Sequence, residues 1–244
     1  MTVSPLSPPD ALAMAIAGRL AEIRRRIELA ARGAGRTPDA VRLVAVSKTF
    51  DVAYVRAAAA AGQVDFGENR VQEALQKIDQ SSDLQIRWHL VGHLQSNKAR
   101  RAATAFAMIH SLDSLDLLTQ IDRAAEEAGA APELLVQVDL AGEATKHGAP
   151  VSAVRPLFEA GGRCRAARVV GLMVLPPLGA APEVSRPWFR RLRDLRDGLA
   201  AEGTPPSMLR ELSMGMSGDF EVAVQEGATL VRVGTAIFGT RHHV

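Results

Sequence analysis

The sequence feature that most constrains this fold is a regular alternation of short apolar segments with amphipathic segments along most of the chain. Segments such as Leu43-Val44-Ala45-Val46 are continuously apolar, which is typical of β-strands covered on both faces. We expect strands in the segments Val41–Thr49, Asp65–Asn69, Ile86–Gly92, Met108–Asp113, Leu134–Leu140, Val169–Leu175, Leu209–Ser213 and Leu230–Val233. Helical periodicity between them predicts helices over Ala99–Phe106, Leu115–Ala128, Val151–Ala160, Trp188–Ala201 and Phe220–Gln225.

Alternating strands and helices favour a sheet of parallel strands. About eight such units in a chain of 244 residues match the size of a (β/α)8 TIM barrel. An open doubly wound sheet is the alternative, and it is disfavoured because no glycine-rich fingerprint follows the first strand. The sequence therefore predicts an α/β fold in which residues 1–244 form a single TIM-barrel domain. An extra N-terminal helix over Ala11–Ala31 and a loose arm over Met1–Pro9 precede the first strand.

Composition excludes several classes of partner. The net charge is only +2, and the basic cluster Arg24-Arg25-Arg26 is short enough to be a solvated helix face, so we expect no nucleic acid. No window reaches the roughly 20 apolar residues that span a bilayer, and the N-terminus lacks the pattern of a signal peptide, so we expect no membrane partner. The single cysteine, Cys164, cannot form an internal disulfide, which fits a cytoplasmic protein.

Lys48 is the first candidate functional residue, because function in a TIM barrel lies at the carboxyl ends of the strands. It ends the first apolar segment, so we expect its amine in a partly desolvated mouth, where burial lowers a lysine pKa. An uncharged amine there can attack an aldehyde and form an imine. A lysine at a strand end can also snorkel to the surface, so Lys48 alone does not decide its role.

The next two strands also end in polar residues. Asn69 and His89 could both point into the mouth of the barrel. His89 and His93 are four residues apart, but on a strand-to-loop segment rather than a helix, and this does not place them on one face as metal ligands. No clear third ligand accompanies them, so we expect no metal.

The loops after the last two strands predict a phosphate site, because TIM barrels often bind phosphate there. One loop reads SMGMSGD over residues 213–219, and the other begins with Gly234 and Thr235. Small residues let the backbone approach an anion, and helix N-termini offer free N–H groups. Ser217 and Thr235 add hydroxyl donors. The alternative is that Ser217 or Asp219 simply caps the next helix.

An imine-forming lysine and a phosphate site together indicate a phosphorylated aldehyde as the ligand. Pyridoxal 5′-phosphate (PLP) fits this description, and so does the sugar phosphate of a lysine-dependent aldolase. Such aldolases usually carry the lysine on a later strand, commonly the sixth. The sixth segment here, Val169–Leu175, contains no lysine, so the aldolase is disfavoured.

Five long motifs resemble those of one family. The segments VAVSKT, FGENRVQE, WHLVGHLQSNK, LSMGMSGDFEVAVQEGAT and VRVGTAIFG are similar to the YggS/PROSC family of pyridoxal phosphate homeostasis proteins, and the resemblance extends from the first strand to Gly239. Members of this family look like the barrel domain of alanine racemase without its second domain. The resemblance therefore implies an alanine racemase N-terminal domain-like barrel that binds PLP covalently.

The resemblance also implies which residues bind the cofactor. They are Lys48 for the internal aldimine, Ser217, Gly234 and Thr235 for the phosphate with Ser213 nearby, Arg232 for the pyridine nitrogen, and Asn69, His89 and Met214 along the ring. An arginine can only donate hydrogen bonds, so Arg232 leaves the ring nitrogen unprotonated and makes the ring a poor electron sink. That suits a protein that holds the cofactor.

The same resemblance bears on catalysis. In the racemases, a second catalytic base is a tyrosine from the extra domain. This sequence ends shortly after Gly239, and its one tyrosine, Tyr54, lies near the start of the helix after Lys48. No acid–base candidate is better than His89. We therefore expect a carrier or regulator for PLP homeostasis without substrate turnover. The alternative is a PLP-dependent amino-acid racemase or decarboxylase of the alanine racemase fold type.

Delivery of the cofactor is feasible because an incoming amine can displace Lys48. We therefore expect transient contact with PLP-dependent apoenzymes. Lys146, after the fifth strand, could act as a relay, although a solvated loop lysine is the simpler interpretation. Without a second domain the usual racemase dimer contacts are missing, so we expect a monomer.

Overall fold

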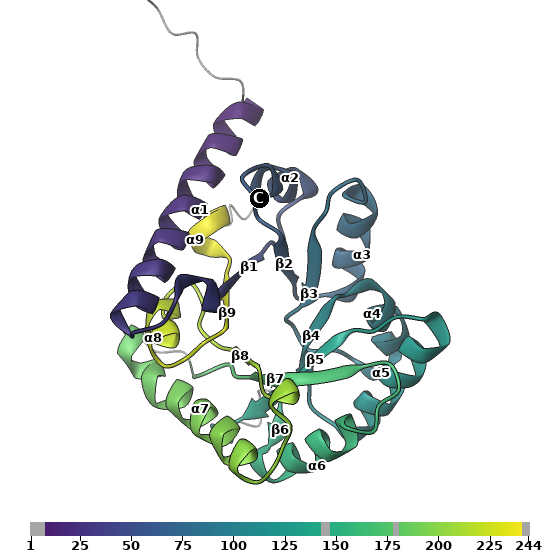
Figure 1. The fold of residues 1–244 in the computed structure, drawn as a ribbon. Helices are drawn as coiled ribbons and strands as arrows, with labels where there is room; N and C mark the ends of the chain where they lie inside the picture. Colours follow the sequence, from purple (N-terminus) through teal and green to yellow (C-terminus); the bar gives the residue numbers. More distant parts are fainter. Residues whose placement is uncertain (1–7, 143–146, 178–180, 241–244) are drawn as a thin grey trace, which may run out of the picture.

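The strands form a closed ring of parallel strands that is surrounded by helices (Figure 1). The computed structural model describes residues 8–142, 147–177 and 181–240. Pairing runs from β1 to β5, then through β7, β8 and β9, and β9 pairs with β1 to close the ring. The ring strands are β1 (Arg42–Val46), β2 (Asp65–Glu68), β3 (Arg87–Leu90), β4 (Met108–Leu112), β5 (Glu133–Asp139), β7 (Arg168–Met173), β8 (Glu211–Ser213) and β9 (Leu230–Val233).

Each of the eight predicted segments overlaps one of these strands, which confirms the TIM barrel, although β5 and β7 each begin one residue before the predicted segment. A further strand, β6 (Ala149–Pro150), was not predicted, because it has only two residues and pairs beside the end of β5. The first strand is shorter than predicted. It ends at Val46 because residues 47–49 leave the sheet in a turn, where Thr49 has a φ of 70°.

Helices cover the outside of the ring. Their ends follow local capping: Ser114 Oγ accepts the N–H of Leu117 at 3.3 Å at the start of α5, and Gly129 ends this helix with a left-handed φ of 65°. The helices are α1 (Pro8–Gly33), α2 (Val52–Ala60), α3 (Val71–Gln80), α4 (Ala99–Ala105), α5 (Leu115–Ala128), α6 (Val151–Gly161), α7 (Arg186–Ala201), α8 (Phe220–Gln225) and α9 (Thr235–Phe238). Short 3-10 helices are η1 (Pro38–Ala40), η2 (Ser96–Lys98), η3 (Pro182–Ser185) and η4 (Pro206–Met208).

The extra N-terminal helix is longer than predicted. Helix α1 begins at Pro8, so the last two residues of the predicted loose arm belong to it, and residues 1–7 lie outside the described part of the chain. Ile16, Leu20, Ile23 and Ile27 are buried at helical spacing on one face. That face packs beside α2, α8 and α9 (Figure 1).

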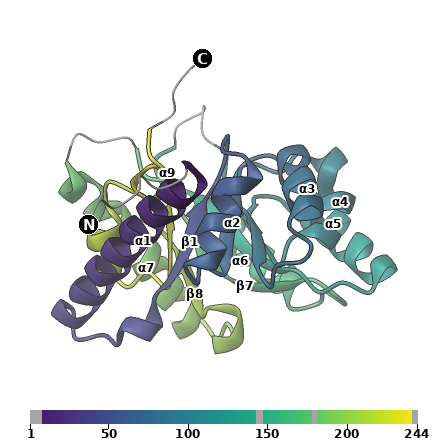
Figure 2. The same ribbon diagram turned by 90° about the horizontal axis from the view of Figure 1, so that it is seen from above.

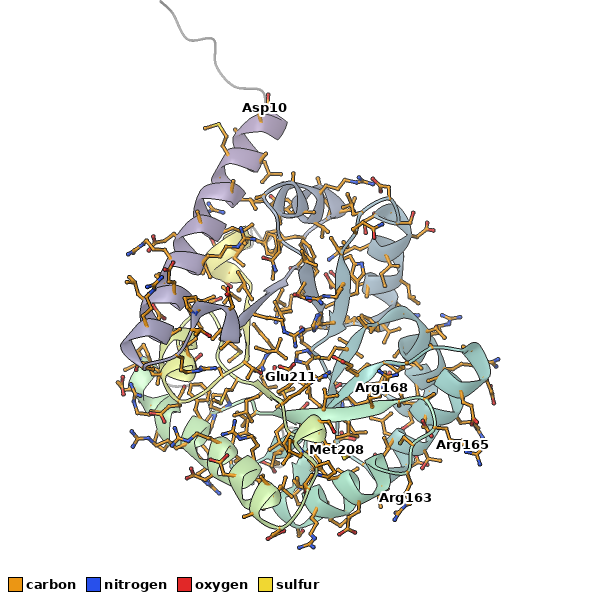
Figure 3. All side chains as sticks on the ribbon, in the orientation of Figure 1. Asp10, Arg163, Arg165, Arg168, Met208 and Glu211 are labelled. Atoms are coloured by element: carbon orange, nitrogen blue, oxygen red, sulfur yellow. The ribbon has the colours of Figure 1, made fainter. Side chains whose placement is uncertain are left out.

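Both faces of the ring strands are buried, which explains the continuously apolar segments. On β1, Val44 and Val46 belong to the apolar cluster inside the barrel, whereas Leu43 and Ala45 belong to the cluster between strands and helices. Figure 3 shows side chains filling the ring, while Arg163 and Arg165 point outward. Helix α9, which follows β9 in the sequence, lies at one end of the barrel in the view of Figure 2. Within the described segments, no helix has both the length and the apolar composition needed to cross a bilayer.

Candidate functional site

A cavity of about 580 Å³ opens at the carboxyl ends of the strands. This volume lies in the range of sites for small ligands. Its lining comes from segments far apart in the sequence, because the ring brings all strand ends to one edge. The charged and polar side chains of the lining are Lys48, Asn69, His93, Gln137, His147, Ser217, Arg232 and Thr235.

The structure brings most of the predicted site residues to this cavity. Those in its lining are Lys48, Asn69, Ser217, Arg232, Gly234 and Thr235. The other three predicted residues, His89, Ser213 and Met214, are not in the lining, so their contact with a cofactor stays a prediction. His89 lies two residues before the lining residue Val91 and is therefore one layer deeper in the barrel. Met214 is fully buried in the core between strands and helices.

The turn that carries Lys48 is held by a buried ion cluster behind β1. The N–H of Thr49 donates to Glu73 Oε1 at 2.5 Å, and Lys77 Nζ donates to the carbonyl oxygen of Ser47 at 2.8 Å. A left-handed φ is uncommon for a β-branched residue such as Thr49. These two bonds flank Lys48 in the sequence, so they fix the backbone from which its partly buried side chain extends.

The same cluster places two carboxylates, the buried Glu68 and the partly exposed Glu73, around one buried ammonium group. Lys77 Nζ lies 2.7 Å from Glu68 Oε1 and 2.9 Å from Glu73 Oε1. Ser47 Oγ also donates to Glu68 Oε1, at 2.6 Å. Burial raises the pKa of Glu68 in spite of the bonds from Lys77 and Ser47, which oppose it. The sequence analysis did not identify this cluster, although Glu73 and Lys77 stand at the i, i+4 spacing of a helical ion pair.

The two loops predicted to bind phosphate contact each other. Ser217 Oγ accepts the backbone N–H of Gly234 at 3.2 Å. A Cβ at Gly234 would lie 3.0 Å from the carbonyl oxygen of Val46, so only glycine fits there without a shift. Asp219 is the residue before α8, but its side chain accepts from the N–H of Met216 at 2.6 Å and makes no cap hydrogen bond.

Arg232 reaches the cavity from inside the barrel. Its Nη1 donates to Ser213 Oγ at 2.5 Å, and its Nη2 donates to the carbonyl oxygen of Val174 at 2.9 Å. Burial lowers the pKa of Arg232 to about 10, with Asp219 acting in the opposite direction. The guanidinium group therefore remains a cation at neutral pH and a donor toward the cavity.

Three polar residues of the lining, His93, Gln137 and His147, were not among the predicted site residues. The rings of His93 and His147 stack with centroids 3.6 Å apart and an interplanar angle of 9°. Burial and the neighbouring His147 lower the pKa of His93, whereas Asp113 opposes this. Gln137 donates from Nε2 to the carbonyl oxygen of His147. Its polar side chain within the apolar run Leu134–Leu140 was the available signal.

Two further expectations concern ligands of this region. Within the described segments, no group of three or more metal-ligating side chains lies close enough together to hold an ion. Lys146, the suggested relay, lies outside the described residues.

Comparisons with known proteins agree with this geometry. The family described as "Alanine racemase, N-terminal domain" matches residues 19–242. The chain is 41% identical over 225 residues to the pyridoxal phosphate homeostasis protein of Aquifex aeolicus, covering 92% of this chain and 98% of that protein. It is 43% identical over 229 residues to the pyridoxal phosphate homeostasis protein of Pseudomonas aeruginosa, covering 93% and 96% of the two chains.

A solved structure shares the whole barrel. PipY of Synechococcus elongatus, solved with PLP bound, superposes with a TM-score of 0.82 at 42% sequence identity, over 92% of this chain and 100% of that one. Identity at this level over nearly the full length of each relative shows the family. The chain therefore belongs to the alanine racemase N-terminal domain family and, within it, to the pyridoxal phosphate homeostasis proteins.

Proposed function

We propose that this protein binds PLP in the cavity at the strand ends, covalently through Lys48, and holds it for intracellular PLP homeostasis. The observation that carries the proposal is that one cavity joins a lysine at the end of β1 to the paired loops of Ser217 and Gly234. The homeostasis role of the relatives and the PLP bound to PipY support it. An aldehyde such as that of PLP reacts reversibly with a primary amine, which allows both storage and release.

The donor set of the cavity fits the chemical parts of PLP. Ser217 and Thr235 offer hydroxyl groups, and the adjacent Gly218 and Gly234 have no side chain to keep a phosphate group from the backbone. Arg232 is a buried cation that can only donate, which suits a pyridine nitrogen that accepts. Asn69 completes the proposed contacts. His89 and Ser213 act from below the cavity in this proposal, through Arg232.

We assign no substrate turnover to this site. A donor at the pyridine nitrogen makes the ring a weak electron sink, because it disfavours protonation of that nitrogen. Tyr54, the one tyrosine, packs against Phe50 and Phe238 with ring centroids 4.8 and 6.4 Å away and is not part of the cavity lining. Inversion or decarboxylation of an amino acid by the purified, PLP-loaded protein would contradict this part of the proposal.

The remaining parts of the proposal concern partners and location. In this proposal, the reversible bond to Lys48 allows transient contacts in which PLP passes to PLP-dependent apoenzymes. We propose a monomer in the cytoplasm, where the single Cys164 stays reduced. Size-exclusion chromatography with light scattering tests the oligomeric state.

The covalent bond can be located because the chain has four lysines, Lys48, Lys77, Lys98 and Lys146. The protein is incubated with PLP, reduced with borohydride and digested, and mass spectrometry identifies the modified peptide. We expect the adduct on Lys48, its loss in Lys48→Ala, and its retention in the control variant Lys98→Ala, whose lysine is not in the cavity lining. An adduct on another lysine, or no uptake of PLP at all, contradicts the proposal.

A further inference from the structure

A continuous chain of buried polar side chains crosses the barrel beneath the cavity. Arg232 Nη1 donates to Ser213 Oγ at 2.5 Å, and Ser213 Oγ lies 2.8 Å from His110 Nδ1. His110 Nε2 lies 3.0 Å from His89 Nδ1, and His89 Nε2 lies 2.9 Å from Asp65 Oδ1. All five side chains are buried, with Asp65 the most exposed at 5%.

The two ends of this chain determine the direction of each hydrogen bond. An arginine can only donate and an ionised carboxylate can only accept. His89 therefore donates from Nε2 to Asp65 and accepts at Nδ1 from His110 Nε2. His110 accepts at Nδ1 from the Ser213 hydroxyl, whose oxygen accepts from Arg232. With both imidazoles neutral, each polar atom of the chain has a partner, as buried polar groups require.

If the hydrogen bonds between His89, His110 and Ser213 ran in the opposite direction, the buried hydroxyl of Ser213 would be left unsatisfied. A protonated His89 would donate from both nitrogens, and His110 would then donate from Nδ1 to Ser213 Oγ. Among the described residues, the other hydrogen bond of Ser213 Oγ comes from Arg232, which is itself a donor. The serine proton would thus lack an acceptor, which is unfavourable for a buried group.

The far end of the chain is neutralised by a second arginine. Arg87 donates to both oxygens of Asp65, from Nε at 2.7 Å and from Nη2 at 2.8 Å. Burial alone would raise the pKa of Asp65, but the hydrogen bonds from His89 and Arg87 outweigh it and bring the pKa to about 2. Asp65 and Arg87 line a second cavity, of about 600 Å³, so the row of hydrogen-bonded side chains runs between two cavities.

The other charged groups near the imidazoles act in the same direction. Burial lowers the pKa of His110 well below its usual range, and His89, Arg232 on β9 and Arg42 on β1 lower it further. Arg42 has its own carboxylate partner, Glu211 on β8, at 2.6 Å. The negative group nearest the imidazoles is thus Asp65, which Arg87 already compensates.

We propose that Asp65, His89, His110 and Ser213 are positioning residues for Arg232, holding Ser213 as an acceptor so that Arg232 presents its remaining N–H groups to the cavity. Arg87 controls the direction of this chain from the opposite end of the barrel. The proposal rests on the proposed function, because PLP is the ligand that Arg232 would meet.

The direction of the chain can be tested without cofactor. Nitrogen-15 NMR of histidine-labelled protein at neutral pH reports the protonation of each ring nitrogen, with His89→Gln and His110→Gln spectra for assignment. We expect His89 and His110 to be neutral, each with its proton on Nε2. A doubly protonated His89, or a proton on Nδ1 of His110, overturns the proposal whether or not the protein binds PLP.

The effect on the cofactor is tested with a matched pair of serines. Ser213 and Ser111 are both fully buried, but Ser111 Oγ has no hydrogen-bond partner among the described residues. We expect Ser213→Ala to weaken PLP binding about tenfold and to shift the absorbance band of the bound cofactor, whereas Ser111→Ala changes neither. Wild-type affinity and band in a folded Ser213→Ala overturn the positioning role. Failure of the wild type to take up PLP would instead contradict the proposed function.

A distant arginine provides the second test. Arg87→Gln removes the counter-ion of Asp65, so we expect the hydrogen bonds to reverse direction at His110, with its proton on Nδ1, and the PLP absorbance band to change. Arg56→Gln is the control. Arg56 makes a similar two-point contact with Asp83, at 2.9 and 2.6 Å, but this pair lies on the surface and takes no part in the hydrogen bonds beneath the cavity. If Arg87→Gln leaves the histidine tautomers and the PLP absorbance band unchanged, Arg87 does not set the direction of these hydrogen bonds.

Discussion

Ser217 Oγ accepts the backbone N–H of Gly234 at 3.2 Å, so the loops after β8 and β9 form one continuous wall of the cavity. The two loops belong to parts of the sequence 17 positions apart, and the pairing of β8 with β9 brings them together. In the proposed PLP complex, this wall faces the phosphate group.

The first prediction concerns the hydroxyl groups of this wall. We expect Ser217→Ala and Thr235→Ala each to weaken PLP binding, because a hydrogen bond to a charged group contributes roughly 1.5–3 kcal/mol. Equilibrium dialysis with PLP measures the loss for each variant. Ser207→Ala, an exposed serine outside the cavity lining, should bind as the wild type does. If both hydroxyl variants retain PLP as tightly as that control, the phosphate assignment is wrong.

The second prediction concerns the ion cluster behind Lys48. Lys77→Met leaves the buried carboxylate of Glu68 and the partly exposed carboxylate of Glu73 without their cation. Breaking one side of a buried ion pair costs about 3–5 kcal/mol of the free energy of unfolding. Urea denaturation measures this loss, with Lys98→Met as the control.

A double variant separates charge from packing in this cluster. In Lys77→Met alone, the carboxylate of Glu68 has lost its cation. The double variant Lys77→Met with Glu68→Gln also removes that charge, so it should be more stable than Lys77→Met alone. Equal stabilities for the single and the double variant would show that the charge on Glu68 does not determine the loss.

The third prediction concerns pH. The pKa of Asp65 is about 2 in the folded protein and 3.8 as the ordinary value. A lowered folded-state pKa means that the unfolded chain binds the proton more readily, so the stabilisation, about 2 kcal/mol, is present above about pH 4 and is lost as the pH falls toward 2. We expect the free energy of unfolding of Asp65→Asn to fall less steeply over this range than that of the wild type. Parallel pH profiles would mean that Asp65 has an ordinary pKa.

The barrel was predictable from the sequence because its signal repeats. Most strands coincide with an apolar run in the sequence, and an error of a few residues at the ends of a run, as at Val41 and Thr49, does not change the architecture. The strand β6 carried no such signal, since two residues are too few for any periodicity.

The candidate site was predictable only in part, because position along a strand does not by itself give depth. Asn69 and His89 both stand near strand ends, yet Asn69 lines the cavity while His89 is bonded below it to Asp65 and His110. The partners of His89 come from β2 and β4, and no local spacing in the sequence joins them. His147 likewise reaches His93 only through the fold.

The fourth prediction concerns the backbone of the loop after β8. Gly215 has a φ of +90°, and a Cβ there would lie 2.5 Å from the Cβ of Ala223 and 3.0 Å from the Cα of Phe220. Gly215→Ala should therefore lower the free energy of unfolding, with backbone strain alone contributing about 1–3 kcal/mol. Gly218→Ala in the same loop is the matched control, since its φ is ordinary and no atom lies within 4 Å of the added Cβ. Thermal or urea unfolding of both variants without PLP makes the comparison. Because Gly215 and Ser217 share this loop, a destabilised Gly215→Ala should also bind PLP more weakly. A variant with wild-type stability and affinity would mean that the loop can move away from α8 at no cost.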